Sequence, residues 1–230
     1  MTLSIIVPVL DEARAIGPTL AALQVLRGQG AEVIVVDGGS RDATAALAAP
    51  LADRVMAAPR GRAAQMNAGA HAARGEVLLF LHADTLLPAA AAADLAGELD
   101  RHGRVWGRFD VAIDARGALL ALVGWFMNAR SRLTGIATGD QAIFVRASAF
   151  AAAGGFPEIP LMEDVALSKA LKRQSPPLCL RDRVVTSARR WKRHGTLNTI
   201  FLMWRLRLAY ALGADPQRLA RRYDAERPSP

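Results

Sequence analysis

The sequence predicts an α/β fold, in which helices cover both faces of a mostly parallel central sheet and form a three-layer sandwich. Strand and helix patterns alternate through the first hundred residues, as is typical of parallel sheets. In VLLFLHAD at 77–84, five consecutive apolar residues predict a strand that is buried on both faces. With 230 residues, the chain is long enough for one large core.

The expected elements follow one another without an internal repeat or a long linker, which favours a single domain over residues 1–230. In the first half, strands are expected at 3–9, 32–38, 53–58 and 76–84, and helices at 12–27, 41–49, 62–74 and 88–101. In the second half, strands are expected at 104–114, 141–146 and 178–186, and helices at 117–133, 147–153, 163–173 and 196–212.

Composition and charge narrow the classes of function. Cys179 is the single cysteine, which excludes a disulfide framework and suits a reducing compartment. The N-terminus resembles a first strand rather than a signal peptide, and no apolar run reaches the roughly 18 residues of a spanning helix. Lys and Arg number 15 against 17 Asp and Glu up to Leu171, and 14 against 4 from Lys172 onward. This basic C-terminal quarter indicates nucleic acid, a phosphorylated substrate or a membrane surface as partner, or simply a solvated tail.

Acidic residues follow three of the expected strands, where ligands of open parallel sheets bind. These are Asp11 with Glu12, Asp37, and Asp84. The carboxylate of Asp37 in VVDGGSRDAT is suited to a nucleobase or a ribose hydroxyl, or else it only caps the next helix. Asp84 is suited to hold Mg²⁺ or Mn²⁺ against phosphates, with His82 on the same side of the strand. The alternative is a capping aspartate beside a structural histidine.

Three further segments carry polar side chains suited to chemistry. In APRGRAAQMNAG, Gly61 and Arg62 open a helix, where a diphosphate would meet a helix N-terminus and a guanidinium. In PLMEDVALSKAL, Glu163 and Asp164 open another helix, either as a general base or as acids stabilised by the helix dipole. In TSARRWKRHG, Trp191 is flanked by arginines and suits a sugar and a phosphate, unless the loop is merely solvated.

Taken in order, these motifs resemble a family 2 glycosyltransferase of the GT-A fold, which is Rossmann-like. The resemblance covers roughly residues 3 to 193. It rests on the series SIIVPVLDE, VVDGGS, GRAAQMNAG, LFLHADT, GDQAIFVR, MEDVALS and RRW. The chain also resembles a small bacterial subgroup associated with radical-SAM and arsenosugar gene clusters.

The resemblance implies a nucleotide-sugar donor, with a UDP-sugar favoured, a divalent metal (Mn²⁺ or Mg²⁺) and inversion at the anomeric carbon. It implies a nucleotide-binding half at 1–101, an acceptor-binding half at 102–195 and C-terminal helices at 196–230. It places the donor against Pro8, Val9, Glu12, Asp37, Gly61, Arg62, His82 and Ala83, and the substrate against Gly139, Asp140, Gln141, Arg190 and Trp191. Asp84 matches the metal-binding aspartate, His194 is expected as a further metal ligand, and Asp164 of the Glu163–Asp164 pair matches the catalytic base.

Two departures from the family pattern limit these assignments. His82 stands where the metal motif of the family has its first aspartate. The ribose contact that this aspartate would make is therefore not expected of His82 with the same certainty as the metal contact of Asp84. Ser187 stands where processive synthases have glutamine, which argues against a polymerising enzyme.

Other classes fit less well, although one remains open. A nucleotidyltransferase would carry a glycine-rich loop after the first strand, and a Rossmann dehydrogenase would carry GxGxxG; PVLDEARAIG is neither. A non-catalytic nucleotide-sugar binding module stays open.

The expected partners follow from the same resemblance and from the C-terminal helix. They are a nucleotide-sugar and a small-molecule or lipid-linked acceptor, with no nucleic acid. The helix TLNTIFLMWRLRLAYALG is suited to the core or a homodimer face, which we favour, or to peripheral contact with an anionic membrane. The expected location is the cytoplasm, including the inner membrane face.

Overall fold

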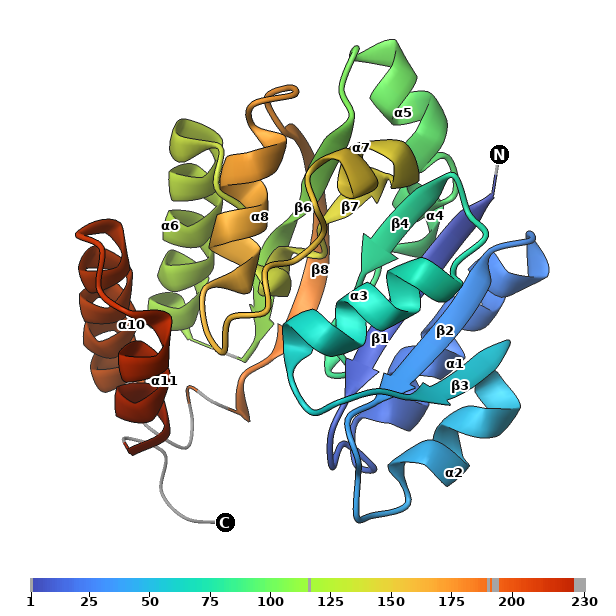
Figure 1. Cartoon of the computed structure of the whole chain (residues 1–230), viewed down its shortest axis with the longest axis horizontal. Helices are drawn as coiled ribbons and strands as arrows, with labels where there is room; N and C mark the ends of the chain where they lie inside the picture. Colours follow the sequence, from blue (N-terminus) through green and yellow to red (C-terminus); the bar gives the residue numbers. More distant parts are fainter. Residues whose placement is uncertain (1, 116, 190, 192–194, 226–230) are drawn as a thin grey trace.

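The computed structural model describes residues 2–115, 117–189, 191 and 195–225 (Figure 1). Its strands form one sheet in the order β3-β2-β1-β4-β7-β6-β8-β5. The strands are β1 (Leu3–Val9), β2 (Glu32–Asp37), β3 (Arg54–Ala57), β4 (Val77–Phe80), β5 (Thr85–Leu86), β6 (Trp106–Asp114), β7 (Phe144–Arg146) and β8 (Leu178–Ser187).

The sheet is mostly parallel, as the alternating sequence pattern predicts. β3, β2, β1 and β4 run parallel to one another, and β6 runs parallel to β8. β7 is antiparallel to both β4 and β6, while the short β5 is antiparallel to β8. Because β5 follows β4 closely in the chain but pairs at the far edge, the β4–β5 connection reaches the end of β8.

Helices cover both faces of this sheet (Figure 1). They are α1 (Ile16–Gly28), α2 (Thr44–Ala48), α3 (Arg62–Ala72), α4 (Ala89–Ala92), α5 (Leu95–Arg101), α6 (Ala118–Thr134), α7 (Ala147–Ala152), α8 (Glu163–Leu171), α10 (Thr196–Ala211) and α11 (Pro216–Ala225), with short 3₁₀ turns η1 (Ala49–Leu51) and η2 (Gly139–Gln141). Apolar side chains of α1, α4 and α5 pack on one face, and those of α3, α7 and α8 pack on the other.

The central strands are apolar on both faces because both faces are covered. Along β1, Ile5 and Val7 join the core under α1, whereas Ile6 joins the core under α3. Phe80 at the end of β4 contacts Phe150 and Phe156, with ring centroids 5.2 and 4.8 Å apart. This aromatic cluster holds the point where the chain leaves β4 toward its polar continuation.

Several element boundaries differ from the sequence prediction. The helix expected at 12–27 begins only at Ile16, because residues 10–15 form a loop that bonds to the next loop. The helix expected at 88–101 is two helices, and the side chain of Asp94 caps the second by accepting from Gly97 N–H. The strand expected at 76–84 ends at Phe80 and is followed by a turn and β5.

The C-terminal helices pack by one side only. Leu206 of α10 and Leu219 of α11 form a small core with Met162 and Val165 at the start of α8. The expected core packing of the C-terminal helix is therefore confirmed for this side of α10. Within the described residues, no helix has the length and apolar character that crossing a membrane requires.

Candidate functional site

A cleft of about 470 Å³ lies beyond the ends of β1 and β4. Its walls come from segments far apart in the chain, between the β1–α1 loop and α11. Ten predicted site residues line it: Pro8, Val9, Glu12, Gly61, Arg62, His82, Ala83, Asp84, Asp140 and Trp191. The structure thus brings most of the expected donor-side residues to one hollow.

The loop after β1 is held in place by the loop after β2. Asp11 adopts a left-handed conformation with φ 53°, and its carboxylate accepts a hydrogen bond from Arg41 N–H at 2.7 Å. Ser40 Oγ accepts from Asp11 N–H at 2.9 Å, and Thr44 Oγ1 accepts from Glu12 N–H at 2.8 Å. These bonds fix the backbone at Glu12, so its carboxylate stands at the cleft.

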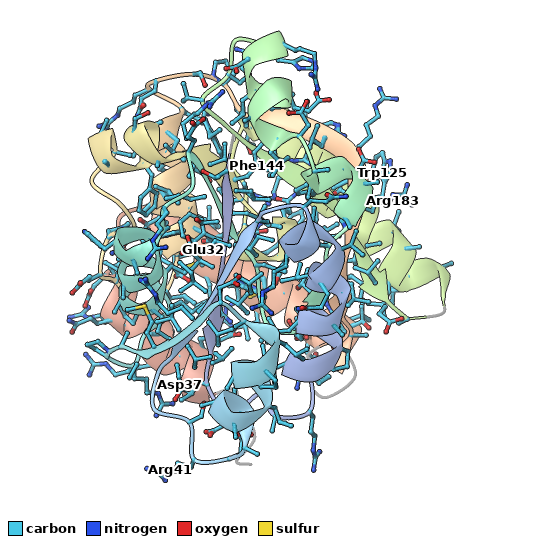
Figure 2. The ribbon with its side chains drawn as sticks, turned by 90° about the vertical axis from the view of Figure 1, so that its right-hand side faces the viewer. Glu32, Asp37, Arg41, Trp125, Phe144 and Arg183 are labelled. Carbon is cyan, nitrogen blue, oxygen red and sulfur yellow. The ribbon has the colours of Figure 1, made fainter. Side chains whose placement is uncertain are left out.

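Asp37 lies at the same end of the sheet as Arg41 (Figure 2) but is not among the residues that line the cleft. Its carboxylate accepts from both the N–H and the hydroxyl of Ser40. Gln65 fixes this edge from α3, because its amide donates to the carbonyls of Val9 and Val36, each at 2.8 Å. Asp37 therefore shapes the turn that follows β2, and its predicted contact with the base stays a prediction.

The start of α3 places one guanidinium at the cleft. Gly61 precedes the helix with φ 145°, a conformation that favours glycine, and Arg62 is the first helical residue. Arg62 Nη1 lies 4.0 Å from Glu163 Oε1, so this arginine connects α3 to α8. Helix N–H groups and a guanidinium at one place suit a diphosphate.

His82 is held between two parts of the chain. Its Nδ1 lies 3.3 Å from Asp140 Oδ1. Gly139 presses against the opposite ring nitrogen, since a Cβ added there would lie 2.5 Å from His82 Nε2. The neighbouring carbonyl of Ala83 accepts from the buried Thr19 hydroxyl at 2.7 Å. The turn that presents Asp84 is thus fixed by contacts from α1 and from η2.

Asp84 shares a cation with Glu12. Arg189 Nη2 donates to Glu12 Oε2 at 2.7 Å and to Asp84 Oδ2 at 3.1 Å. Ser187 N–H donates to the Asp84 carbonyl at 3.1 Å, which brings Arg189 to this position. The sequence motif marks the arginines of this loop but not their partners, because this contact depends on β5 pairing with β8.

The two carboxylates fit a divalent cation. A positive charge already lies between them, and Mg²⁺ sites in proteins often use one or two carboxylates together with substrate phosphates. The described residues contain no group of three or more metal-binding side chains. The predicted ligand His194 and the predicted substrate contact Arg190 lie outside the described residues.

Glu163 and Asp164 lie directly behind the wall that Arg62 and Asp140 form. Asp164 Oδ2 accepts from Gly139 N–H at 2.9 Å, so Gly139 fixes the carboxylate through its backbone. Glu163 is 6% exposed, and burial, followed by the negative charge of Asp164, raises its pKa to about 7. This pair therefore holds at least one carboxylate that titrates near neutral pH.

Gln141 lies in the core rather than at the cleft. It is fully buried, its Oε1 accepts from Thr138 N–H at 3.3 Å, and its amide donates to Asn128 at 3.4 Å. Its observed role is to hold η2, which in turn places Gly139 and Asp140.

Some wall residues have no counterpart among the predicted site residues. Arg60 directly precedes Gly61, a predicted site residue, so the same sequence motif could have indicated it. Ala220 and Tyr223 come from α11, and no local pattern marks them because the return of α11 depends on its packing against α10.

The comparisons with known proteins agree with this geometry. The glycosyl transferase family 2 profile matches residues 4–152, which is well over half of the chain. No curated protein sequence matches it significantly.

Several solved structures with similar folds are glycosyltransferases. TarS 1-349 from S. aureus with UDP-GlcNAc has a TM-score of 0.65 and 20% identity, covering 82% of this chain and 59% of that chain. The mannosyltransferase PcManGT from Pyrobaculum calidifontis, with GDP-Man and Mn²⁺, has a TM-score of 0.64 and 22% identity, covering 90% and 60%. Glucosyl-3-phosphoglycerate synthase from Mycobacterium tuberculosis, with Mn²⁺, UDP and its product, has a TM-score of 0.59 and 18% identity, covering 80% and 70%.

The chain spans about three fifths of the length of the first two of these structures. At these identities the likeness concerns the fold, and it confirms the expected GT-A-type architecture. The family match rests on the sequence itself. It confirms the expected glycosyltransferase at the level of family: this chain belongs to glycosyl transferase family 2.

Proposed function

We propose that this family 2 glycosyltransferase moves a sugar from a nucleotide-sugar donor, preferably a UDP-sugar, to an acceptor hydroxyl with inversion. The observation that carries the proposal is one cleft lined by Glu12 and Asp84, which share Arg189, and by Arg62, whose guanidinium lies 4.0 Å from Glu163 behind the wall. Structures of similar fold hold UDP- or GDP-linked ligands, two of them with Mn²⁺, which supports this donor class.

On the donor side, each wall has a proposed role. Pro8 and Val9 border the nucleoside, and Asp37 contacts the base after exchanging its bond with Ser40. Arg62 and the first turn of α3 receive the diphosphate. Trp191, which lines the cleft, packs on the sugar.

Asp84 and Glu12 hold the divalent metal in this proposal, and Arg189 leaves them when the metal binds. The metal offsets negative charge on the departing nucleoside diphosphate. His194 stays a predicted further ligand. The proposal requires no protein nucleophile, because one displacement inverts the anomeric carbon.

Asp164 is the proposed base. The acceptor oxygen forms its bond to the anomeric carbon as the bond to the diphosphate oxygen breaks, and the acceptor proton passes to the Asp164 carboxylate. Gly139 N–H, at 2.9 Å, holds that carboxylate in position. The acceptor, a small molecule or a lipid-linked one, and membership of the radical-SAM-associated subgroup stay predictions.

Calorimetry of UDP binding with and without Mn²⁺ tests the donor proposal. The parent protein should bind UDP much more tightly with Mn²⁺, and Asp84→Asn should weaken that binding about tenfold or more. Asp182→Asn, an exposed carboxylate on β8, is the matched control and should bind as the parent does. Equal affinity in Asp84→Asn and the parent would remove Asp84 from the metal site. UDP release from a UDP-sugar then separates an enzyme from a binding module.

A further inference from the structure

Two arginines near Asp164 lack partners in the described part of the chain. Arg130 comes from α6 and Arg207 from α10, and both are partly buried. Arg130 Nε and Nη2 and Arg207 Nε are buried nitrogen atoms without a hydrogen-bond partner. Three unmet donors on two cations are unusual, because buried polar groups are nearly always hydrogen-bonded.

The two guanidinium groups also repel each other. Burial, followed by the positive charge of Arg207, lowers the pKa of Arg130 to about 10, whereas Asp164 acts in the opposite direction. Among the described residues, no carboxylate lies within 4 Å of either arginine, while Arg132 on the same helix pairs with Asp110 at 2.9 Å. An unpaired buried cation destabilises a fold unless something else compensates for it.

We propose that Arg130 and Arg207 bind a phosphate group of the acceptor. This assignment to the acceptor rests on the proposed function, because it takes Asp164 as the base. Lys169 Nζ of α8 lies 5.1 Å from the centre of the Tyr210 ring of α10, and Val165 of α8 packs with Leu206 of α10. Asp164 acts electrostatically on Tyr210 and on Arg130, which places Arg130 near this contact. Guanidinium groups suit phosphate because their donors form parallel bonds to its oxygens. An acceptor anchored here by its phosphate would hold a hydroxyl near Asp164.

Calorimetry with inorganic phosphate tests the subsite directly. Arg130→Gln and Arg207→Gln should each weaken phosphate binding about tenfold or more, as loss of a charged hydrogen bond predicts. Arg218→Gln is the matched control, since Arg218 is an exposed arginine of α11 that lines neither the cleft nor the groove between α10 and α11. Arg62→Gln, which removes a cation from the donor cleft, should keep the phosphate affinity. Glycerol 3-phosphate and dihexanoyl phosphatidic acid then distinguish a soluble source of the phosphate from a lipid one.

A second measurement separates binding from a structural role. Without phosphate, Arg207→Gln should melt at or above the parent temperature, because it removes an unpaired cation. Its UDP–Mn²⁺ affinity should not change. Unchanged phosphate affinity in Arg207→Gln would overturn the proposed subsite. A loss of phosphate affinity in Arg62→Gln, with full affinity kept in Arg130→Gln and Arg207→Gln, would overturn it as well. A parent that binds phosphate but not UDP would instead contradict the donor proposal.

A separate observation concerns the outer surface of α6 and α10. In the described part of the chain, ten of the thirteen exposed large apolar side chains belong to these helices and their ends. They are Leu119, Leu122, Trp125, Phe126, Leu133, Leu197, Phe201, Trp204, Leu208 and Leu212. We call this set the apolar surface.

The apolar surface is ordered by helix geometry. On α10, Leu197, Phe201, Trp204 and Leu208 recur at helical spacing on the side opposite the buried Leu206. Both helices lie at the end of the molecule away from β3 and α2 (Figure 1), and Trp125 stands on the outer side of α6 (Figure 2). Trp204 is 72% exposed and Trp125 is 62% exposed.

We infer that the apolar surface docks on an anionic bilayer. Tryptophan and phenylalanine beside arginines are typical of helices that lie in the membrane interface. A groove of about 200 Å³ between α10 and α11 has apolar walls with Arg205 and Arg222 among them, which suits a lipid with an anionic head group. A second copy of the chain fits this surface less well. A two-fold axis would bring Arg205 and Arg222 close to the same arginines of the other copy, and these like charges repel each other.

Flotation with vesicles tests this inference. The parent should bind vesicles containing 30% phosphatidylglycerol and not pure phosphatidylcholine, and high salt should release it. Phe201→Ser with Trp204→Ser should reduce the partition coefficient about tenfold. Val25→Ser, another exposed apolar position, is the control. Equal partitioning of both variants would overturn the inference, and so would a dimer in sedimentation velocity that the Phe201–Trp204 change dissociates.

Discussion

The edge of the sheet that carries Glu12 and Asp84 and the C-terminal part of the chain are built differently. We call the first region the donor edge, after its proposed role. At the donor edge, Glu12 and Asp84 follow their strands within a few residues, and local hydrogen bonds fix the loops. In the C-terminal part, Arg189 reaches the same cleft because β8 pairs with β5, and Tyr223 reaches it because α11 packs against α10. The donor edge is thus specified by local sequence, whereas the rest of the cleft depends on tertiary packing.

Asp164, the proposed base, lies between the two regions, and its substitution should have the largest effect. Asp164→Asn keeps the shape of the side chain and removes its basicity, so transfer should slow by about 10²–10⁴-fold. Donor affinity should stay nearly unchanged, because Asp164 bonds to Gly139 rather than to the donor edge. Single-turnover transfer rates and UDP-sugar calorimetry measure both quantities. If Glu163→Gln slows transfer more than Asp164→Asn does, the roles within the pair are reversed.

Close packing of α3 on the donor edge can be broken by one methyl group. A Cβ at Gly69 would lie 2.5 Å from Ile6 Cγ2 and 3.0 Å from Val36 Cγ2. Gly69→Ala should therefore lower the free energy of unfolding by about 1–3 kcal/mol. Gly28→Ala, at a helix end with no atom near the added Cβ, should be neutral or slightly stabilising. Urea denaturation compares them, and equal stability of the two variants would contradict the tight packing.

The pH dependence of stability probes the burial of Glu163 beside Asp164, an effect that Arg62 opposes. Burial and Asp164 raise the pKa of Glu163 from 4.5 to about 7, so the folded state holds a proton that the unfolded state releases. The contribution of Glu163 to the free energy of unfolding is therefore fully present below about pH 4.5, and it is lost as the pH rises to about 7. The loss should be on the order of 1–3 kcal/mol.

Chemical denaturation of Glu163→Gln between pH 4.5 and 8 measures this loss by difference. The variant should have a flatter profile than the parent and greater stability above pH 7. Glu158→Gln, an exposed glutamate in the preceding loop, should leave the parent profile unchanged. Parallel profiles of Glu163→Gln and the parent would show that Glu163 titrates normally.

The smallest expected effect concerns the cation that the C-terminal part supplies. Arg189 is half exposed, so its bonds to Glu12 and Asp84 are worth at most about 1 kcal/mol. Arg189→Gln should free both carboxylates and strengthen binding of Mn²⁺ alone by about two- to fivefold. Mn²⁺ titration followed by electron paramagnetic resonance measures it, with Arg27→Gln, which pairs with Asp53, as control. Weaker Mn²⁺ binding in Arg189→Gln would show that the arginine supports the metal site.

The position of a side chain is predictable from the sequence where it follows from the residue's own strand or helix. The apolar run before Asp84 and the paired acids at Glu163 and Asp164 are local patterns: α8 begins at Glu163 as expected, and β4 forms inside the expected strand, although it ends at Phe80. Gln141 shares a motif with Asp140 but lies in the core, because η2 turns adjacent side chains in different directions. The contact of Arg189 with Glu12 and Asp84 depends on the pairing of β5 with β8, and the wall from α11 depends on its packing against α10. No local sequence pattern encodes either contact.

The pairing of β5 with β8 also determines when the cleft is completed during synthesis. Asp84 is made early, yet its carbonyl bonds to Ser187 and its carboxylate to Arg189, about a hundred residues later. On the ribosome, β1 to β4 are available for pairing long before β8 emerges, and such distant contacts form slowly. The donor edge therefore stays open at Asp84 until β8 and Arg189 have been translated, after β1 to β4 are already available for pairing.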